Sequence, residues 1–307
     1  MTKVFIDGSA GTTGLRIHER LQNRTDIQLL LLSEENRKDA SARKAALNEA
    51  DIAFLCLPDA AAAEAVSFIE NPHTAVIDTS TAHRTADGWV YGFAELPNQR
   101  EKIKTAKRIA NPGCHASGFN ALTAPLTNAG ILPSDALLTC FSLTGYSGGG
   151  KKMIAEYEDA ERDMLLDAPR QYALTQMHKH LPETQHVCGL AHAPVFCPIV
   201  GSFYSGMEVT VPLFASQING TAADIKEIYK NLYQGPIVHY RDQTDESGFL
   251  SANALADKDS MEISVFGNEE RILLTARFDN LGKGASGAAI QNMNILLGTD
   301  ETCGLIL

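Results

Sequence analysis

A cysteine in a setting that suits a nucleophile lies in the run Asn111-Pro112-Gly113-Cys114. An apolar stretch over 108–110 leads into this Pro-Gly corner, and the cysteine stands where an alanine-rich, helix-like segment begins. Unpaired N–H groups and the dipole of a helix N-terminus favour a thiolate and draw a cysteine pKa down from its free value of about 8.5. A tight turn also favours an exposed sulfur. The run leaves two interpretations open: a nucleophile, or a small buried hydrophobe. His115 either assists the thiol or is only its neighbour.

Length and charge limit what can surround this thiol. The chain has 307 residues, enough for two domains, and a net charge of −11 that argues against nucleic acid or an anionic membrane as a partner. An anionic ligand would therefore need a few well-placed Arg or Lys side chains. The sequence contains no apolar run of membrane-spanning length and no signal segment at its start. We therefore expect a globular, cytoplasmic protein.

The cysteines are scattered, and no C-x-x-C pair occurs among them. This spacing favours neither a zinc site nor a disulfide framework, so we predict reduced thiols and no metal. The six positions are Cys56, Cys114, Cys140, Cys188, Cys197 and Cys303.

A glycine-rich loop follows the first apolar run, Lys3–Asp7, and precedes apolar residues at helical spacing. Strand, loop and helix in this order are typical of a phosphate-binding site, because glycines let the backbone approach a pyrophosphate at the helix N-terminus. A turn that binds nothing is the alternative. The candidate cofactor ligands in this loop are Gly8, Ser9, Gly11, Thr12, Thr13 and Gly14.

The second apolar run, 27–32, ends about where a dinucleotide-binding fold meets the ribose. The usual acidic residue is replaced there by Ser33, and Arg37 follows shortly after. A hydroxyl and a cation suit a 2′-phosphate better than a 2′-hydroxyl, so we predict NADP rather than NAD. Two neighbouring glutamates, Glu34 and Glu35, weaken the argument.

Strand-like and helix-like segments continue to alternate through 51–58, 60–69 and 75–78. Such a parallel sheet binds ligands beyond the carboxyl ends of its strands, which makes Pro58 and Ser80 candidate cofactor contacts. Arg84 lies in the loop after the last of these strands, where it could hold an anionic substrate group through bidentate hydrogen bonds. The alternative for Arg84 is a solvated surface residue. Physical reasoning gives no interpretation for the segment 91–98.

After the cysteine, a predicted strand over 137–144 ends in the glycine-rich loop 145–152, and an acidic helix is predicted over 154–166. The loop either contacts ligands, with Ser147 toward the substrate and Gly148 toward the cofactor, or merely connects two elements. Further on, His178 and His180 are two residues apart, so on an extended segment both could face one cleft. We expect one of them to be a general acid or base for the thiol chemistry.

The remainder predicts a second, α+β domain. Segments 207–214, 261–266 and 271–278 have the pattern of long antiparallel strands, and 222–233 that of a covering helix. A glycine-rich loop from residue 279 leads into an apolar helix over 288–297, which we expect to return to the first domain and to bring Asn280 to the cofactor. The predicted fold is therefore α/β: a Rossmann-type NADP-binding domain at 1–116, completed by 285–307, and a catalytic domain with a mostly antiparallel sheet at 117–284.

Taken together, four motifs resemble the N-acetyl-γ-glutamyl-phosphate reductase family, in its smaller, second type. The resemblance runs nearly end to end. The cysteine motif is shared with aspartate-semialdehyde dehydrogenases, and the histidine and C-terminal asparagine motifs are more discriminating. The segments 79–84 and 191–198 depart from the family pattern. The four motifs are the loop Gly8–Gly14, Asn111–Cys114, His178–Glu183 and Asp279–Gly284 continued through Gln291–Asn294.

The resemblance implies NADPH-dependent reductive dephosphorylation of an acyl phosphate through a thioester on Cys114, in arginine biosynthesis, with His178 as the acid or base. It places His180 and Tyr172 at the substrate pocket, puts Asn280 and Lys283 near the nicotinamide, and implies a homo-oligomer, either dimer or tetramer. Two alternatives remain: an aspartate-semialdehyde dehydrogenase, and a non-catalytic NADP-binding sensor with a redox-active Cys114. The sensor would need a resolving cysteine, and no cysteine lies within about 20 residues of Cys114 in sequence.

Overall fold

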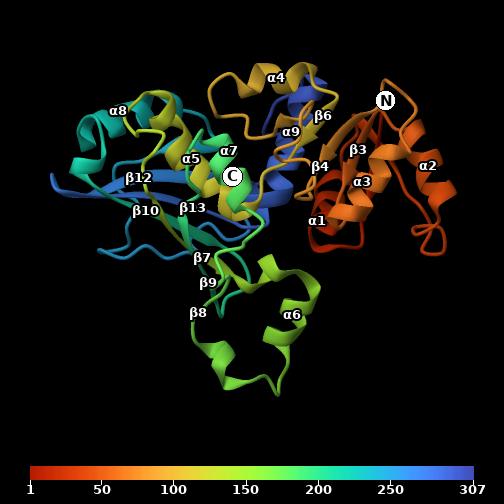
Figure 1. Ribbon diagram of the computed structural model, residues 1–307. Helices are drawn as coiled ribbons and strands as arrows, with labels where there is room; N and C mark the ends of the chain where they lie inside the picture. The colour runs from red at the N-terminus through yellow and green to blue at the C-terminus, as the bar shows by residue number, and fades with distance from the viewer. The chain divides into compact units, whose positions relative to one another are not determined.

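A parallel sheet organises the N-terminal part of the chain, which the computed structural model describes at residues 1–307 (Figure 1). Its strands run in the order β2-β1-β3-β4-β6-β5, and every neighbouring pair is parallel. The central strands are buried along their whole length, as expected for a sheet covered on both faces. The strands are β1 (Thr2–Asp7), β2 (Ile27–Leu30), β3 (Ile52–Leu55), β4 (Ala75–Asp78), β5 (Val90–Tyr91) and β6 (Arg108–Ala110).

Helices pack on both faces of this sheet and bury separate apolar clusters. One cluster joins the sheet to α1 (Thr12–Leu21), α4 (Gln99–Thr105) and α9 (Gly287–Leu297). The other joins it to α2 (Ala40–Glu49) and α3 (Asp59–Ser67). The strand order reverses between β1 and β3, and a doubly wound sheet binds its ligand beyond the carboxyl ends at such a point.

A second, mixed sheet follows in the order β11-β12-β13-β10-β7-β9-β8. Most of its pairs are antiparallel, whereas β7 pairs with β9 and β11 with β12 in parallel. The predicted fold class, a Rossmann-type sheet plus a mostly antiparallel one, is confirmed. The strands are β7 (Thr139–Gly145), β8 (Arg170–Gln171), β9 (Val195–Gly201), β10 (Met207–Phe214), β11 (Val238–Tyr240), β12 (Met261–Gly267) and β13 (Arg271–Phe278).

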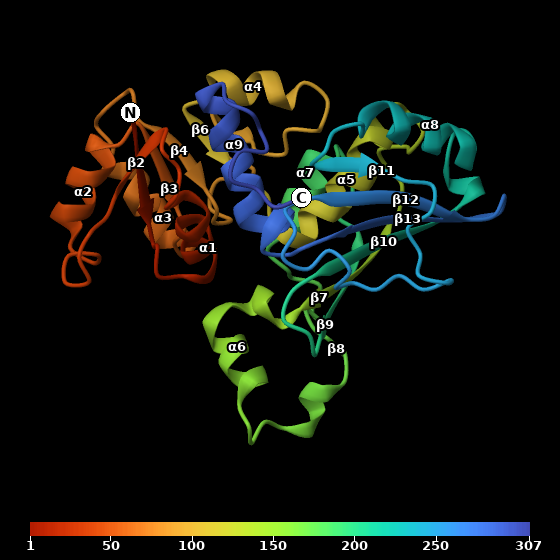
Figure 2. The same cartoon turned by 180° about the vertical axis from the view of Figure 1, so that it is seen from behind.

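The inner face of this second sheet is covered by α5 (Cys114–Asn128), with α7 (Leu181–Val187) and α8 (Ala222–Leu232) packed beside it (Figure 2). Gly118 permits a close approach of α5 to the sheet, because a Cβ there would lie 2.5 Å from Val209 Cγ2 and 2.9 Å from Phe278 Cε1. Tyr233 in turn donates its hydroxyl to the carbonyl of Ala121 at 2.6 Å. The helix that begins at the cysteine is thus fixed on several sides.

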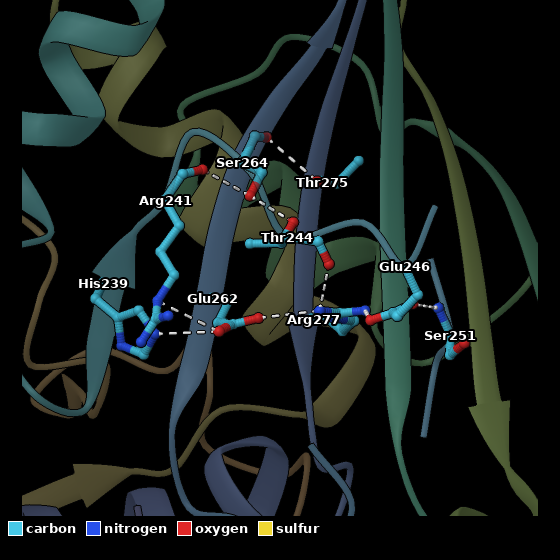
Figure 3. Close-up of polar contacts among 9 residues, drawn as sticks. All are labelled: His239, Arg241, Thr244, Glu246, Ser251, Glu262, Ser264, Thr275 and Arg277. Carbon is cyan, nitrogen blue, oxygen red and sulfur yellow. Dashed lines mark hydrogen bonds and ion pairs between the residues drawn. The ribbon is translucent and has the colours of Figure 1, made fainter. Parts of the chain in front are cut away.

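The segment 241–252 covers part of the outer face of the second sheet, the face opposite α5 (Figure 3). Arg277 on β13 pairs with Glu246 at 2.5 Å and with Glu262 at 3.2 Å, and it donates to the carbonyl of Thr244 at 2.7 Å. The Thr244 and Ser264 hydroxyls are hydrogen bonded at 2.9 Å. These contacts bury polar side chains of β12 and β13 beneath the segment.

The helix predicted over 154–166 is wrong in its bounds. The structure has α6 (Gly150–Glu158) and then a separate 3-10 turn, η2 (Met164–Asp167). The carboxylates of Asp159 and Asp163 accept the N–H groups of Glu161 and Leu165, both at 2.9 Å. Such local bonds compete with helical ones, so the helix ends at the first aspartate.

Two compact units contain these sheets. The first comprises residues 1–94, 98–113 and 285–305, and the second comprises residues 95–97, 114–284 and 306–307. The chain therefore passes from one unit to the other directly before Cys114 and directly after Gly284. None of the helices combines the length and the apolar character needed to cross a membrane.

Candidate functional site

Cys114 is the first residue of α5 and lies directly after the turn that follows β6. The predicted strand, corner and helix start are confirmed. The thiol is half-buried and forms no disulfide. Gly284 lies close to this cysteine, because a Cβ on that glycine would lie only 3.0 Å from Cys114 Cβ. A cysteine here lies at the positive end of the helix dipole of α5, which stabilises negative charge.

Four rings surround His115, the residue that follows the cysteine. Its ring centroid lies 5.7 Å from that of His178, 5.6 Å from His180, 6.1 Å from Tyr172 and 5.3 Å from Phe196. The structure thus brings together the three predicted residues Tyr172, His178 and His180 around a fourth that the sequence left undecided. Its adjacency to Cys114 was the only signal that pointed to His115.

His178 and His180 face each other, with ring centroids 4.7 Å apart, although not for the predicted reason. The segment is not extended, because His180 has helical dihedrals (φ −84°, ψ −11°). The backbone N–H of His180 instead donates to His178 Nδ1 at 3.2 Å and folds the segment back. A ring nitrogen that accepts a hydrogen bond carries no proton, so neutral His178 bears its proton on Nε2.

The electrostatics of the ring cluster keep His115 uncharged. Burial, aided by the nearby charges of His178 and Lys179, lowers the pKa of His115 to about 3. Burial also raises the pKa of the Tyr172 hydroxyl, and the Cys114 thiolate raises it further. His115 is therefore neutral and Tyr172 protonated at neutral pH, and the tyrosine lies within electrostatic reach of the thiolate.

Three other cysteines are in surroundings that suppress a thiolate. Burial raises the pKa of Cys56 to about 12, and it raises the pKa of Cys140 and Cys188 as well. Cys188 also contacts the Asn120 side-chain oxygen at 3.3 Å. These thiols are packing groups, as buried free cysteines usually are.

Ser147 and Asn280, one predicted for the substrate and one for the cofactor, are hydrogen bonded to each other at 3.0 Å. The amide oxygen of Asn280 accepts the N–H of Gly206 at 2.9 Å. A Cβ on Gly148 would lie 3.5 Å from the amide nitrogen of Asn280. The glycine-rich loop after β7 and the loop after β13 thus form one polar corner. Ligand binding by Ser147, Gly148 and Asn280 stays a prediction.

Lys283 has a partner that the sequence did not indicate. Its ammonium lies 2.7 Å from a carboxylate oxygen of Glu95, and both side chains are buried, with exposed fractions of 0% and 6%. Glu95 lies in the segment 91–98, for which sequence reasoning gave no interpretation. Lys283 belongs to η4, a π-helical turn (Gly282–Ser286) beside Cys114. A contact between Lys283 and the cofactor stays a prediction.

The predicted phosphate loop joins β1 to α1 and requires its first glycine. Gly8 has φ +89°, and a Cβ there would lie 2.3 Å from the carbonyl oxygen of Cys56. A Cβ on Gly14 would lie 2.4 Å from the carbonyl oxygen of Gly8. Gly11 caps α1 without any side-chain hydrogen bond, which leaves the first helical N–H groups to bind an anion. The loop, with Ser9, Thr12 and Thr13 in it, fits a dinucleotide pyrophosphate.

Other predicted cofactor residues line the same edge of the parallel sheet. Pro58 directly precedes α3 after β3, and Ser80 follows β4 and donates its hydroxyl to Asp78 at 2.7 Å. Ser33 is exposed after β2, and Arg37, also exposed, pairs with Glu34 at 3.0 Å. A 2′-phosphate would compete with this glutamate for the guanidinium.

Arg84 is buried, with an exposed fraction of 8%, so it is not the solvated residue that the sequence offered as an alternative. Its guanidinium donates to the carbonyl oxygens of Asn111 and Thr79, both at 3.0 Å. Arg84 therefore ties the loop after β4 to the turn that leads to Cys114. Its role in holding a substrate anion stays a prediction.

Comparison with known proteins places this site in a family. Residues 3–106 match the family described as semialdehyde dehydrogenase, NAD binding domain, and residues 114–280 match semialdehyde dehydrogenase, dimerisation domain. The N-acetyl-gamma-glutamyl-phosphate reductase 2 of Nostoc sp. is 45% identical over 318 residues, with 99% of each chain covered. The N-acetyl-gamma-glutamyl-phosphate reductase of Sinorhizobium medicae is 46% identical over 310 residues, covering 96% of this chain and 98% of that one.

Solved structures show the same fold at lower identity. Aspartate semialdehyde dehydrogenase II from Vibrio cholerae, complexed with ASA, has a TM-score of 0.74 at 18% identity and covers 97% of this chain and 98% of its own. Aspartate semialdehyde dehydrogenase from Candida albicans, solved with NADP, has a TM-score of 0.64 at 14% identity, with 97% and 98% covered. At such identities the likeness concerns the fold alone.

Proposed function

Because this chain belongs to the N-acetyl-γ-glutamyl-phosphate reductase family, we propose that it reduces N-acetyl-γ-glutamyl phosphate to N-acetylglutamate semialdehyde with NADPH, a step of arginine biosynthesis. One observation carries the proposal beyond family membership. Cys114 stands at the N-terminus of α5, next to a cluster in which His178 can donate a hydrogen bond from Nε2. A nucleophile and a donor to the developing oxyanion are what acyl transfer to sulfur requires.

The first half of the reaction uses the thiol. The Cys114 thiolate attacks the acyl carbon, a C–S bond forms, the C–O bond to phosphate breaks, and inorganic phosphate leaves with the bonding electrons. The helix N-terminus that holds the thiolate also stabilises the oxyanion that develops during the attack. The product of this half is a thioester on Cys114.

The second half reduces the thioester. The nicotinamide dinucleotide supplies a hydride when bound. The hydride turns the thioester carbonyl into an oxyanion, to which the Nε2–H of neutral His178 can donate a hydrogen bond until the carbonyl re-forms and the C–S bond breaks. The aldehyde then leaves, and Cys114 returns to the thiolate. His115 does not do this work, because both of its ring nitrogens are already hydrogen bonded, Nδ1 to Ser142 and Nε2 to Tyr172.

We assign cofactor binding to the predicted domain 1–116, completed by 285–307, and catalysis to the predicted domain 117–284 together with Cys114, which belongs to the second unit. The glycine loop at Gly8–Gly14 supports this assignment through its backbone geometry and the uncapped start of α1. Ser33 and Arg37 support NADP over NAD. Tyr172 and His180 remain our candidates for the substrate pocket.

We further propose a cytoplasmic homo-oligomer, a dimer or a tetramer. The family description of residues 114–280 as a dimerisation domain supports it. The part of the outer sheet face that the segment 241–252 leaves open is apolar, with Phe141, Val195, Phe214 and Leu273 exposed by 44%, 56%, 60% and 41%. Sedimentation measurements should show a dimer or larger species, and a monomer at micromolar concentration would contradict this part of the proposal.

An assay run in the reverse direction tests the function. Reduction of NADP should depend on added phosphate and on N-acetylglutamate semialdehyde, and kcat/KM with aspartate semialdehyde should be at least about 100-fold lower, because a pocket built for an amide leaves an ammonium group unpaired. The Cys114→Ser variant serves as the blank. Faster turnover of aspartate semialdehyde would overturn the proposed substrate in favour of the related dehydrogenase activity.

A further inference from the structure

A buried ion pair lies at the start of the predicted phosphate loop. Asp7 is the last residue of β1 and is joined by a peptide bond to Gly8, so their Cα atoms are about 3.8 Å apart. The Asp7 carboxylate accepts hydrogen bonds from Arg43 Nε at 3.1 and 3.2 Å, and Arg43 Nη2 lies 3.0 Å from it. Both residues are buried, with exposed fractions of 2% and 8%. The reaction described above uses neither of them.

Arg43 also connects β1 to the two helices on that face of the parallel sheet. It belongs to α2, which follows the segment that carries Ser33 and Arg37. Arg43 Nη1 lies 3.1 Å from a carboxylate oxygen of Glu64 on α3, and the guanidinium lies 5.6 Å from the ring centroid of Phe68. One side chain therefore links the strand before the phosphate loop to the helix after the predicted 2′-phosphate segment.

The phosphate loop itself has no charge that could balance the Asp7 carboxylate. Asp7 is the only charged residue between Val4 and Leu15. A pyrophosphate is an anion, and like charges repel more strongly where burial removes the screening by water. An unpaired carboxylate beside Gly8 would therefore weaken the binding of a pyrophosphate at this loop. Arg43 supplies the cation that balances this carboxylate.

We propose that Arg43 is a positioning residue for the dinucleotide cofactor, because it neutralises Asp7 beside the phosphate loop and holds α2 against the end of β1. Arg43 acts on the cofactor through Asp7. This inference rests on the proposed function, in which the loop Gly8–Gly14 binds the pyrophosphate of NADP.

The groups around Asp7 determine how its charge responds to pH. Burial raises the pKa of the Asp7 carboxyl, the hydrogen bonds and charge of Arg43 lower it, and the charge of Glu64 raises it. Cys56, directly after β3, donates its backbone N–H to the Asp7 carbonyl at 2.8 Å, and a thiol pKa of about 12 keeps it uncharged. Without the guanidinium, burial and Glu64 raise the pKa of Asp7 further. Asp7 should then be protonated in acid and become an unpaired anion as the pH rises.

Binding of oxidised NADP to the protein without substrate tests the proposal. At about pH 8, Arg43→Met should raise Kd by about tenfold or more relative to the wild-type protein, because the Asp7 charge is then unpaired. The ratio of the two Kd values should fall toward one at acid pH, where Asp7 takes up a proton. The cofactor's own phosphate titrates alike in both measurements, so the ratio reports on the protein. Isothermal titration calorimetry measures Kd, and circular dichroism shows whether each variant is folded.

Three further variants separate charge from structure. Asp7→Leu combined with Arg43→Met removes both charges and should return Kd close to the wild-type value at every pH. Asp7→Leu alone removes the carboxylate and keeps the guanidinium, which retains Glu64 as a partner, so it should bind NADP at least as tightly as the wild-type protein. Lys44→Met is the matched control on α2, since Lys44 makes an exposed ion pair with Glu70 at 2.5 Å. Its Kd should be unaltered.

The outcomes distinguish the possibilities. An unchanged Kd in Arg43→Met overturns the proposal. A raised Kd that is independent of pH, or that persists in the double variant, also overturns it, because Arg43 would then act through the structure and not through the charge of Asp7. Weaker binding in Asp7→Leu overturns it even if Arg43→Met does not fold. A failed reductase assay beside the expected Kd values would overturn the proposed substrate alone, whereas wild-type protein that binds no NADP would overturn the cofactor and this inference together.

Discussion

The buried pair of Lys283 and Glu95 gives the sharpest test of how the site is held together. The ammonium and the carboxylate are 2.7 Å apart, with exposed fractions of 0% and 6%, and they join η4 to the segment 95–97 within the second unit. Lys283→Met removes the positive charge while keeping much of the side-chain volume. It leaves the carboxylate of Glu95 buried without its cation.

The magnitude follows from this burial. Removing one partner of a buried ion pair typically costs about 3–5 kcal/mol, because the other charge stays desolvated and unpaired. In a unit of 150–250 residues each kcal/mol lowers Tm by about 2–4 °C. We therefore expect Lys283→Met to lower the Tm of the second unit by about 6–20 °C. Replacing both partners, as Lys283→Met with Glu95→Leu, should restore most of the loss, because apolar pairs of similar volume often match a buried ion pair.

Differential scanning calorimetry measures these shifts and can separate the transitions of the two units. Lys152→Met is the matched control, since Lys152 makes an exposed ion pair with Glu156 at 3.9 Å in the same unit. Exposed pairs contribute little, so no measurable change is expected there. If Lys283→Met had the same Tm as the control, the buried ion pair of Lys283 and Glu95 would be contradicted. If the double variant had a Tm as low as that of Lys283→Met, the unpaired, desolvated carboxylate of Glu95 would not be the cause of the lower Tm.

Three further predictions concern single side chains. Burial depresses the pKa of His115 to about 3, so between about pH 6.5 and pH 3 this histidine is protonated in the unfolded chain but not in the folded one. Its contribution to the free energy of unfolding is therefore fully present above about pH 6.5 and is lost as the pH falls toward 3. Between pH 7 and pH 5 the wild-type protein should lose about 2 kcal/mol more than His115→Gln in urea unfolding, and equal losses would refute the assignment. Arg37→Ala should raise KM for NADPH more than for NADH, since only NADPH has a 2′-phosphate; equal effects would remove the argument for NADP. Arg84→Lys should lower Tm, because an ammonium cannot serve the carbonyls of both Asn111 and Thr79; a lower kcat/KM at unchanged Tm would show that Arg84 holds the substrate anion instead.

The sequence predicted the features that depend on local pattern. Strands β1, β2, β3, β4 and β6 and helices α1 and α3 follow from apolar runs and helical spacing, and the glycine at position 8 follows from the turn after β1, whereas α2, α4 and β5 were not predicted. The helix start at Cys114 follows from the corner before it. Each of these depends on residues that are close together in the chain.

Contacts between residues that are far apart in the chain could not be predicted from the sequence. Glu95 and Lys283 are 188 positions apart, and nothing in the segment 91–98 indicates a buried cation elsewhere. His115 meets Tyr172 across 57 positions, so the ring cluster was visible only as separate residues. The conformation of His178 and His180 was missed because a side-chain-to-backbone bond overrides the extended geometry assumed for the pair.

Trapping the acyl-enzyme tests the central claim most directly. The protein is mixed with N-acetyl-γ-glutamyl phosphate in the absence of NADPH, quenched in acid and digested, and the peptides are examined by mass spectrometry. We predict one N-acetylglutamyl group on Cys114, inorganic phosphate released in equal amount, and no adduct in Cys114→Ser. An adduct on the half-buried Cys197, or turnover that survives in Cys114→Ser, would contradict the mechanism and the site built around it.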